Sequence, residues 1–234
     1  MTVLSAPMYL DDDLDPIARA VQRTLEGYLV FFYDAWVNQN INAITGDYVE
    51  FGSWGANTMH MAYEGMKLSG RTDRHMWAYD SFLPLPEAKD DRDFHPGWRP
   101  GGPMGGGGVG KFHEACERHG IPRDAYTATE GYFDTTLPPL GTDGDPTDIA
   151  ICLIDCNMYS SAVTVFEFLE PRLKHGMILA FDDYYCWTPE RISGEQSILL
   201  EFARDHPEWH FERYRDLHRA GTSFVVQHAD QIPG

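Results

Sequence analysis

The chain has 234 residues, of which 43% are hydrophobic, so it can bury a substantial core in one large domain. Its formal net charge of −18 excludes nucleic acid and anionic membrane as expected partners, because both bind basic surfaces. No basic leader, no apolar run long enough to span a bilayer and no C-x-x-C pair occurs. These features predict a reduced, cytoplasmic protein.

The first 45 residues are expected to form an N-terminal helical arm or lid, placed before a main domain of residues 46–234. An acidic arm (1–13) precedes a helix that begins at Pro16 and runs to about Tyr28. Its apolar stripe is Ile17, Val21, Leu25 and Leu29. The aromatic residues that follow predict a second amphipathic helix packed on the sheet; the alternatives are a lid over a substrate pocket or a face for a homo-oligomer. They are Tyr28, Phe31, Phe32, Tyr33 and Trp36.

A glycine-bearing turn follows a short strand that ends on Glu50. The pattern Glu-x-Gly-x-x-Gly, with Gly52 and Gly55, lacks the first glycine of the dinucleotide fingerprint and has an acid in its place. Glycines here let the backbone approach a cofactor closely, although they are also consistent with a simple tight turn. The acid disfavours a pyrophosphate and favours a cationic or hydroxyl-bearing ligand.

The next strand, 75–79, ends on Asp80. In nucleotide-binding sheets an acid at this point accepts hydrogen bonds from ribose hydroxyls; the alternative is an acid that merely ends a strand. Residues 87–108 then form a long glycine-rich stretch, predicted to be either a mobile cap that closes over substrate or a passive linker, with Phe94 and Trp98 as docking residues. A helix at 109–119 and a strand at 126–129 follow.

Two apolar runs end on acids. Residues 149–154 precede Asp155, and 177–181 precede Asp182 and Asp183, with a helix at 159–170 between the two runs. A right-handed crossover makes the strands parallel and brings their acidic ends to one edge of the sheet. Clustered carboxylates repel, so they need a cation, a shared proton or a basic partner, and an oxygen-rich pocket suits Mg²⁺. The alternative is acids that cap strands or bind substrate hydroxyls. A helix from Ser193 and an antiparallel hairpin (209–214 with 223–227) complete the chain.

Taken in order, these motifs resemble those of the macrocin and mycinamicin O-methyltransferase family, a group of class I S-adenosylmethionine-dependent methyltransferases. The matching pieces are Val49-Glu50-Phe51-Gly52, Tyr79-Asp80-Ser81-Phe82, Glu130-Gly131-Tyr132-Phe133, Ile154-Asp155 with Met158-Tyr159-Ser160-Ser161, Pro171-Arg172-Leu173, and Phe181-Asp182-Asp183-Tyr184 with Trp187. The resemblance implies an α/β, Rossmann-like fold: a mostly parallel seven-stranded sheet with helices on both faces and a C-terminal antiparallel hairpin.

The resemblance further implies Mg²⁺-dependent transfer of a methyl group from S-adenosylmethionine to a hydroxyl of a small natural product or its sugar. Asp155, Asp182 and Asp183 would bind the metal, and Asp155 is also the candidate catalytic base, with His95, His113 or His218 as other possibilities. The implied cofactor-binding residues are Glu50, Gly52, Ser53, Asp80, Ser81, Gly131, Tyr132 and Asp155. Asn157 departs from the family, which usually has an acid there. A metal-independent methyltransferase acting on an amine or carboxylate, and a non-catalytic module of the same fold, are the alternatives.

Overall fold

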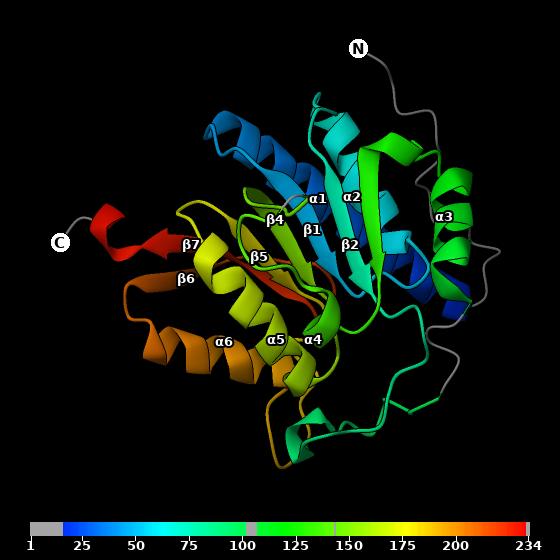
Figure 1. Cartoon of the computed structure of the whole chain (residues 1–234), viewed down its shortest axis with the longest axis vertical. Coiled ribbons are helices and arrows are strands. Elements are labelled where there is room, and N and C mark those ends of the chain that lie inside the picture. Colours follow the sequence, from blue (N-terminus) through cyan, green and yellow to red (C-terminus); the bar gives the residue numbers. More distant parts are fainter. Residues whose placement is uncertain (1–15, 102–106, 143, 233–234) are drawn as a thin grey trace.

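A computed structural model of the chain describes residues 16–101, 107–142 and 144–232. It contains a seven-stranded sheet in the order β3-β2-β1-β4-β5-β7-β6 (Figure 1). The first five strands are parallel, and β7 runs antiparallel to both β5 and β6. The predicted sheet and its C-terminal hairpin are therefore confirmed. The expected acidic arm at 1–13 lies outside the described residues.

The central strands are buried on both faces, as their apolar sequences predict. Every residue of β4 and β5 is buried. The strands are β1 (Asp47–Phe51), β2 (Met76–Asp80), β3 (Tyr126–Glu130), β4 (Ile149–Ile154), β5 (Ile178–Phe181), β6 (Trp209–Asp216) and β7 (Thr222–His228).

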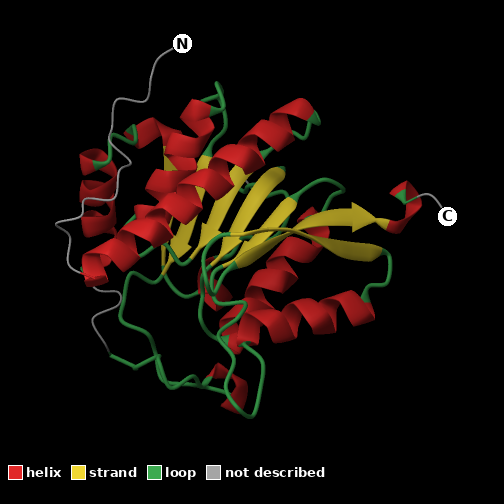
Figure 2. Cartoon of the chain, turned by 180° about the vertical axis from the view of Figure 1, so that it is seen from behind, coloured by secondary structure: helices red, strands yellow, loops and turns green. Residues whose placement is uncertain are grey.

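Helices cover both faces of the sheet, and each face has its own hydrophobic core (Figures 1 and 2). One core is formed with α1 (Pro16–Ile41), α2 (Asn57–Leu68) and α3 (Gly108–Arg118), and the other with α4 (Phe133–Thr136), α5 (Tyr159–Leu169) and α6 (Gly194–Asp205). Short 3-10 helices are η1 (Asp91–Asp93), η2 (Arg123–Ala125), η3 (Glu170–Arg172) and η4 (Ala229–Gln231). None of the helices in the described part of the chain is long and apolar enough to cross a membrane.

The prediction of two N-terminal helices is wrong, because α1 is a single helix of 26 residues. Gly27, which lies near the expected break, is inside the helix, where a side chain would clash with the carbonyl oxygen of Leu217. The buried face also differs from the expected stripe, since Val21 is 55% exposed. Among the side chains of α1 that the structure describes, those from residue 20 onward, the buried ones are Tyr28, Phe31, Phe32, Ala35, Trp36 and Gln39. Aromatic area therefore decides which face packs on the sheet.

Candidate functional site

The site lies at the carboxyl ends of the parallel strands, where β1 and β4 are neighbours and the strand order reverses. Hydrogen bonds extend the sheet by one residue past β4 and β5. The amide of Asp155 donates to the carbonyl of Phe51 at 2.8 Å, and that of Asp182 donates to the carbonyl of Ile154 at 2.9 Å. The backbone thus fixes both acids at the same edge, as the crossover between the strands predicts.

The three predicted metal ligands converge. Asp155, Asp182 and Asp183 each offer a carboxylate oxygen, and these atoms all lie within 4.8 Å of one another. Burial and the neighbouring Asp183 raise the pKa of Asp155 well above its ordinary value. Burial and the repulsion of Asp182 raise the pKa of Asp183 to about 6. Hard carboxylate oxygens that repel one another in a half-buried pocket are a donor set that fits Mg²⁺.

The carboxylate of Asp183 accepts hydrogen bonds from two neighbouring side chains. Asn157 donates to Asp183 Oδ2 at 2.6 Å, and the Cys186 thiol donates to Asp183 Oδ1 at 3.1 Å. Asn157 has φ +60, in the left-handed region that asparagine tolerates better than most residues. Asn157, where the resemblance predicts an acid, therefore acts as a hydrogen-bond donor to a neighbouring acid.

Glu195 is the residue of this site that sequence reasoning missed. It is fully buried in the first turn of α6, accepting the backbone N–H of Cys156 at 3.3 Å and that of Asp183 at 2.9 Å. One carboxylate thus joins the loop after β4 to the loop after β5. Burial, followed by the charge of Asp183, raises the pKa of Glu195. An acid in the first turn of a helix is too common to single out from sequence.

A cavity of about 690 Å³ opens beside the aspartate cluster. Asp155 belongs to both, whereas Asp182 and Asp183 are not among the residues that line the cavity. The predicted cofactor residues along its wall are Gly52, Asp80, Ser81, Gly131, Tyr132 and Asp155. Of the two that do not line it, Glu50 is fully buried and Ser53 nearly so.

Glu50 and Ser53 are buried polar residues close in sequence to Gly52 of the cavity wall. Within the described chain, Glu50 Oε1 and Ser53 Oγ form no well-aligned hydrogen bond, and the hydroxyls of Ser53 and Thr58 lie close enough to the Glu50 carboxylate to lower its pKa. The other oxygen, Glu50 Oε2, accepts a hydrogen bond from the hydroxyl of Tyr48 at 2.6 Å. Burial raises the pKa of Glu50 to about 7.

The turn after β1 approaches β4 closely. Gly52 has φ +92, and a Cβ there would clash with the carbonyl oxygen of Asp155. Asp80 Oδ2 orders the same turn by accepting the amides of Ser53 at 2.7 Å and Trp54 at 2.8 Å, while Oδ1 accepts the amide of Phe82 at 2.7 Å. Oδ2 uses both of its lone pairs in this way, whereas Oδ1 keeps one free, so a contact from Oδ1 to a ribose hydroxyl stays compatible with this arrangement.

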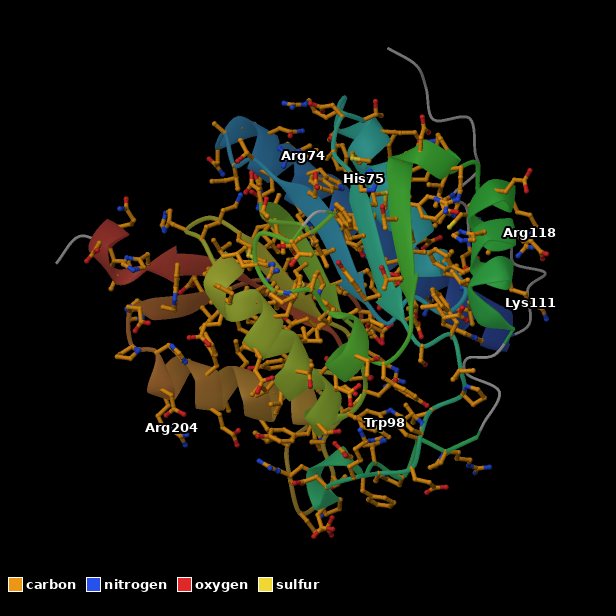
Figure 3. All side chains as sticks on the ribbon, in the orientation of Figure 1. Arg74, His75, Trp98, Lys111, Arg118 and Arg204 are labelled. Atoms are coloured by element: carbon orange, nitrogen blue, oxygen red, sulfur yellow. The ribbon has the colours of Figure 1, made fainter. Side chains whose placement is uncertain are left out.

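The segment 87–101 covers one wall of the cavity through Lys89, Gly97, Trp98 and Arg99. Figure 3 places Trp98 at the end of the molecule opposite Arg74 and His75, near the lower ends of α4 and α5. Buried Asp93 fastens the segment to α5 by accepting Ser160 N at 2.8 Å and Ser160 Oγ at 3.0 Å. The sequence predicts that both aromatic residues dock, but Phe94 is 60% exposed.

The three candidate histidines occupy different places. His218 contacts Asp182, with Nε2 2.6 Å from Oδ1. His113 lies on α3 and pairs with the hydroxyl of Tyr126 at 2.8 Å. His95 packs against Trp98, with ring centroids 4.8 Å apart. Of the three, His218 is the one that contacts the aspartate cluster.

The topology defines a class I S-adenosylmethionine-dependent methyltransferase fold. The O-methyltransferase NovP superposes with a TM-score of 0.68 at 18% identity, covering 86% of this chain and 80% of NovP. Residues 29–196 match the family described as Macrocin-O-methyltransferase (TylF). The chain belongs to this family, so the resemblance seen in its motifs is confirmed.

Two curated relatives are named as O-methyltransferases. One is the 8-demethyl-8-(2,3-dimethoxy-alpha-L-rhamnosyl)-tetracenomycin-C 4'-O-methyltransferase of Streptomyces olivaceus, 30% identical over 149 residues that span 61% of this chain and 54% of the relative. The other is the Mycinamicin III 3''-O-methyltransferase of Micromonospora griseorubida, 24% identical over 157 residues that span 61% of this chain and 57% of the relative. The chain thus spans little more than half of the length of each.

Proposed function

We propose that the protein is a Mg²⁺-dependent O-methyltransferase that transfers a methyl group from S-adenosylmethionine to a hydroxyl on a small natural product or its sugar. The observation that carries the proposal is the position of Asp155, which lines the cavity and also belongs to the cluster of three aspartates. Metal-assisted methyl transfer to a hydroxyl requires the methyl donor and the cation to be bound side by side, and a shared side chain places their two sites next to each other. The family and the names of the sugar-modifying relatives support the choice of acceptor.

Two groups would be bound. S-Adenosylmethionine would supply an electrophilic methyl group, and Mg²⁺ would supply a Lewis acid for the acceptor hydroxyl. For the first, the fit is supported by the close turn at Gly52 and by the cavity wall at Asp80 and Tyr132. For the second, it is supported by the hard oxygen donors of Asp155, Asp182 and Asp183.

Asp155 is proposed as the general base. With Mg²⁺ bound, the Asp155 carboxyl would stay ionised and the pKa of the acceptor hydroxyl would be lowered, so that the Asp155 oxygen not used for the cation could accept the hydroxyl proton. Asp155 lies at the boundary of the cavity and the aspartate cluster, where an acceptor hydroxyl would meet both. The segment 87–101 would help to exclude water from this space, because Trp98 forms part of its wall.

The direct test is incubation of the protein with S-adenosylmethionine, Mg²⁺ and a panel of glycosylated natural products, followed by mass spectrometry. We expect one acceptor to gain a single methyl group, and we expect a chelator to abolish this gain. Activity that survives the chelator would favour metal-independent transfer to an amine or carboxylate. Failure to bind S-adenosylmethionine in calorimetry would favour a non-catalytic module.

A further inference from the structure

The turn between β6 and β7 is packed between α1 and the end of β5. A Cβ on Gly27 of α1 would clash with the carbonyl oxygen of Leu217, and a Cβ on Gly221 would lie 2.8 Å from the carbonyl oxygen of Phe181. Both distances are shorter than a Cβ atom allows. Glycine is therefore needed at position 27, in the helix that packs on the turn, and at position 221, in the turn itself. The turn therefore sits at a fixed place beside Asp182.

Within this turn, the ring of His218 is oriented by two hydrogen bonds. The amide of Ala220 donates to Nδ1 at 3.2 Å, so the ring proton is on Nε2. Nε2 lies 2.6 Å from Asp182 Oδ1 and donates to it. This bond fixes the rotation of the Asp182 carboxylate, and with it the direction in which Asp182 presents its oxygens to Asp155 and Asp183.

Tyr28 of α1 makes the third contact with the ring. Its hydroxyl lies 3.2 Å from His218 Nε2, and the two ring centroids are 5.2 Å apart. Tyr28 is 4% exposed and belongs to the same core as Leu217. The chain of contacts therefore runs from the buried face of α1 to a carboxylate of the aspartate cluster.

We propose that His218 is a positioning residue for Asp182 and that Tyr28 positions His218, so that α1 contributes to cation binding at the aspartate cluster. This inference rests on the proposed function, which makes Asp182 a metal ligand. A surface ion pair would have no such role, but here the side chains of His218 and Asp182 are only 12% and 19% exposed. Side chains that orient a metal ligand commonly change metal affinity when they are replaced.

The test is a titration of the protein with Mn²⁺, which prefers the same oxygen ligands as Mg²⁺, in the absence of cofactor and acceptor. Electron paramagnetic resonance of free Mn²⁺ gives the dissociation constant directly. We expect His218→Leu to weaken binding roughly 10- to 100-fold. His218→Gln, which keeps an N–H donor near the position of Nε2, should recover part of this loss, and Tyr28→Phe should weaken binding about fivefold.

The double variant, Tyr28→Phe with His218→Leu, shows whether Tyr28 acts through His218 or whether the two residues affect cation binding independently. If Tyr28 acts through His218, adding Tyr28→Phe to His218→Leu should change the affinity no further. The matched control is Tyr33→Phe, the same change at a side chain of α1 that is 41% exposed, and it should leave Mn²⁺ affinity unchanged. Circular dichroism and thermal unfolding of each variant check that the fold is retained.

Three outcomes would overturn the inference, and they differ from one another. Unchanged affinity in His218→Leu would exclude positioning by His218 while leaving the proposed metal site intact. If Tyr28→Phe lowered the Mn²⁺ affinity equally in the wild type and in His218→Leu, Tyr28 would not act through His218. A wild-type protein that binds no Mn²⁺ would remove the metal from the proposed function, and this inference with it.

Discussion

Asp182 differs from Asp155 because it lies outside the cavity wall, and from Asp183 because its side chain contacts His218. We expect Asp182→Asn to lower turnover about a hundredfold or more, since Lewis-acid assistance is worth several kcal/mol. S-Adenosylmethionine affinity should stay within about twofold, because the variant keeps its shape and its contact with His218. Calorimetry and steady-state kinetics measure the two effects.

The control for this change is Asp205→Asn, which removes the same charge from an exposed acid on α6 that pairs with Arg204. It should alter neither turnover nor cofactor affinity. Loss of cofactor binding in Asp182→Asn, together with activity that no longer depends on metal, would contradict the assignment of Asp182 to the cation site.

Glu50 should make the free energy of unfolding depend on pH, and its contribution can be separated from that of other groups by substitution. Burial raises its pKa from 4.5 to about 7, so between these values the folded state keeps a proton that the unfolded state loses. The free energy of unfolding therefore falls as pH rises through this window, by about 3 kcal/mol in total. Below pH 4.5 Glu50 causes no loss of stability, because it is protonated in both states, and above about pH 7 the loss has reached its full size.

Glu50→Gln should remove this pH-dependent term, because the amide does not titrate and its carbonyl oxygen still accepts the hydroxyl of Tyr48. Urea unfolding in the presence of a chelator, at pH 5.5 and pH 8, measures it. Between the two pH values the wild type should lose about 2 kcal/mol more than the variant. Parallel pH profiles for the two proteins would show that Glu50 is ionised at its ordinary pKa.

The residues of the candidate site were predictable to different degrees. Asp155 and the pair Asp182-Asp183 were predictable from sequence because each follows a buried apolar strand, and parallel strands bring such acids together. Glu195 was not, since its role depends on where α6 begins in space relative to two loops. The contact of His218 with Asp182 joins residues 36 positions apart, and no sequence pattern specifies it.

At the scale of elements, periodicity predicted the strands and most helices well and failed in α1. The stripe through Val21 and Leu25 follows helical spacing, but the aromatic residues after it supply more area to bury and set the packed face. Gly27 is compatible with a helix end in sequence, whereas in the structure it allows Leu217 to approach. Close approaches of this kind are properties of the tertiary structure.

The segment 87–101 is held by Asp93, which also accepts the amides of Lys89 at 2.9 Å and Asp90 at 3.0 Å. Asp93→Ala removes a buried charged acceptor. Because the hydrogen bonds to Ser160 are then lost, opening of the segment should become easier by about 2 kcal/mol. Chymotryptic cleavage after Trp98 should then accelerate roughly 30-fold, because cleavage follows the population of the open form.

Asp91→Ala is the matched control, since Asp91 lies on the same 3-10 helix but is exposed. It should leave the rate of cleavage unchanged. If Asp93→Ala is cleaved no faster than wild type, the segment does not depend on Asp93 for its position, and the prediction of a cap that opens over the cavity loses its structural support.

At the scale of the whole molecule, α1 packs into the core of the sheet and also presents an apolar outer surface. Val30, Tyr33 and Ile41 are 38%, 41% and 75% exposed. A homo-oligomer through the N-terminal helices stays a prediction that this surface would accommodate. Light scattering of the wild type and of Ile41→Glu tests it: we expect the variant to shift toward monomer, and a monomeric wild type would exclude the association.

Cation binding should also raise the thermal stability of the whole molecule. A ligand that binds only the folded state stabilises it by about 2.7 kcal/mol at a concentration of 100 times its dissociation constant, which for a chain of this size raises the melting temperature by roughly 5–10 °C. Mg²⁺ would also screen the net charge of −18, and screening alone gives some stabilisation. Sodium chloride at matched ionic strength measures that screening. The Asp182→Asn variant keeps nearly the same net charge and should show the screening effect alone. A Mg²⁺ shift of equal size in both proteins would mean that the ion acts on the surface charge and that the three aspartates hold no cation.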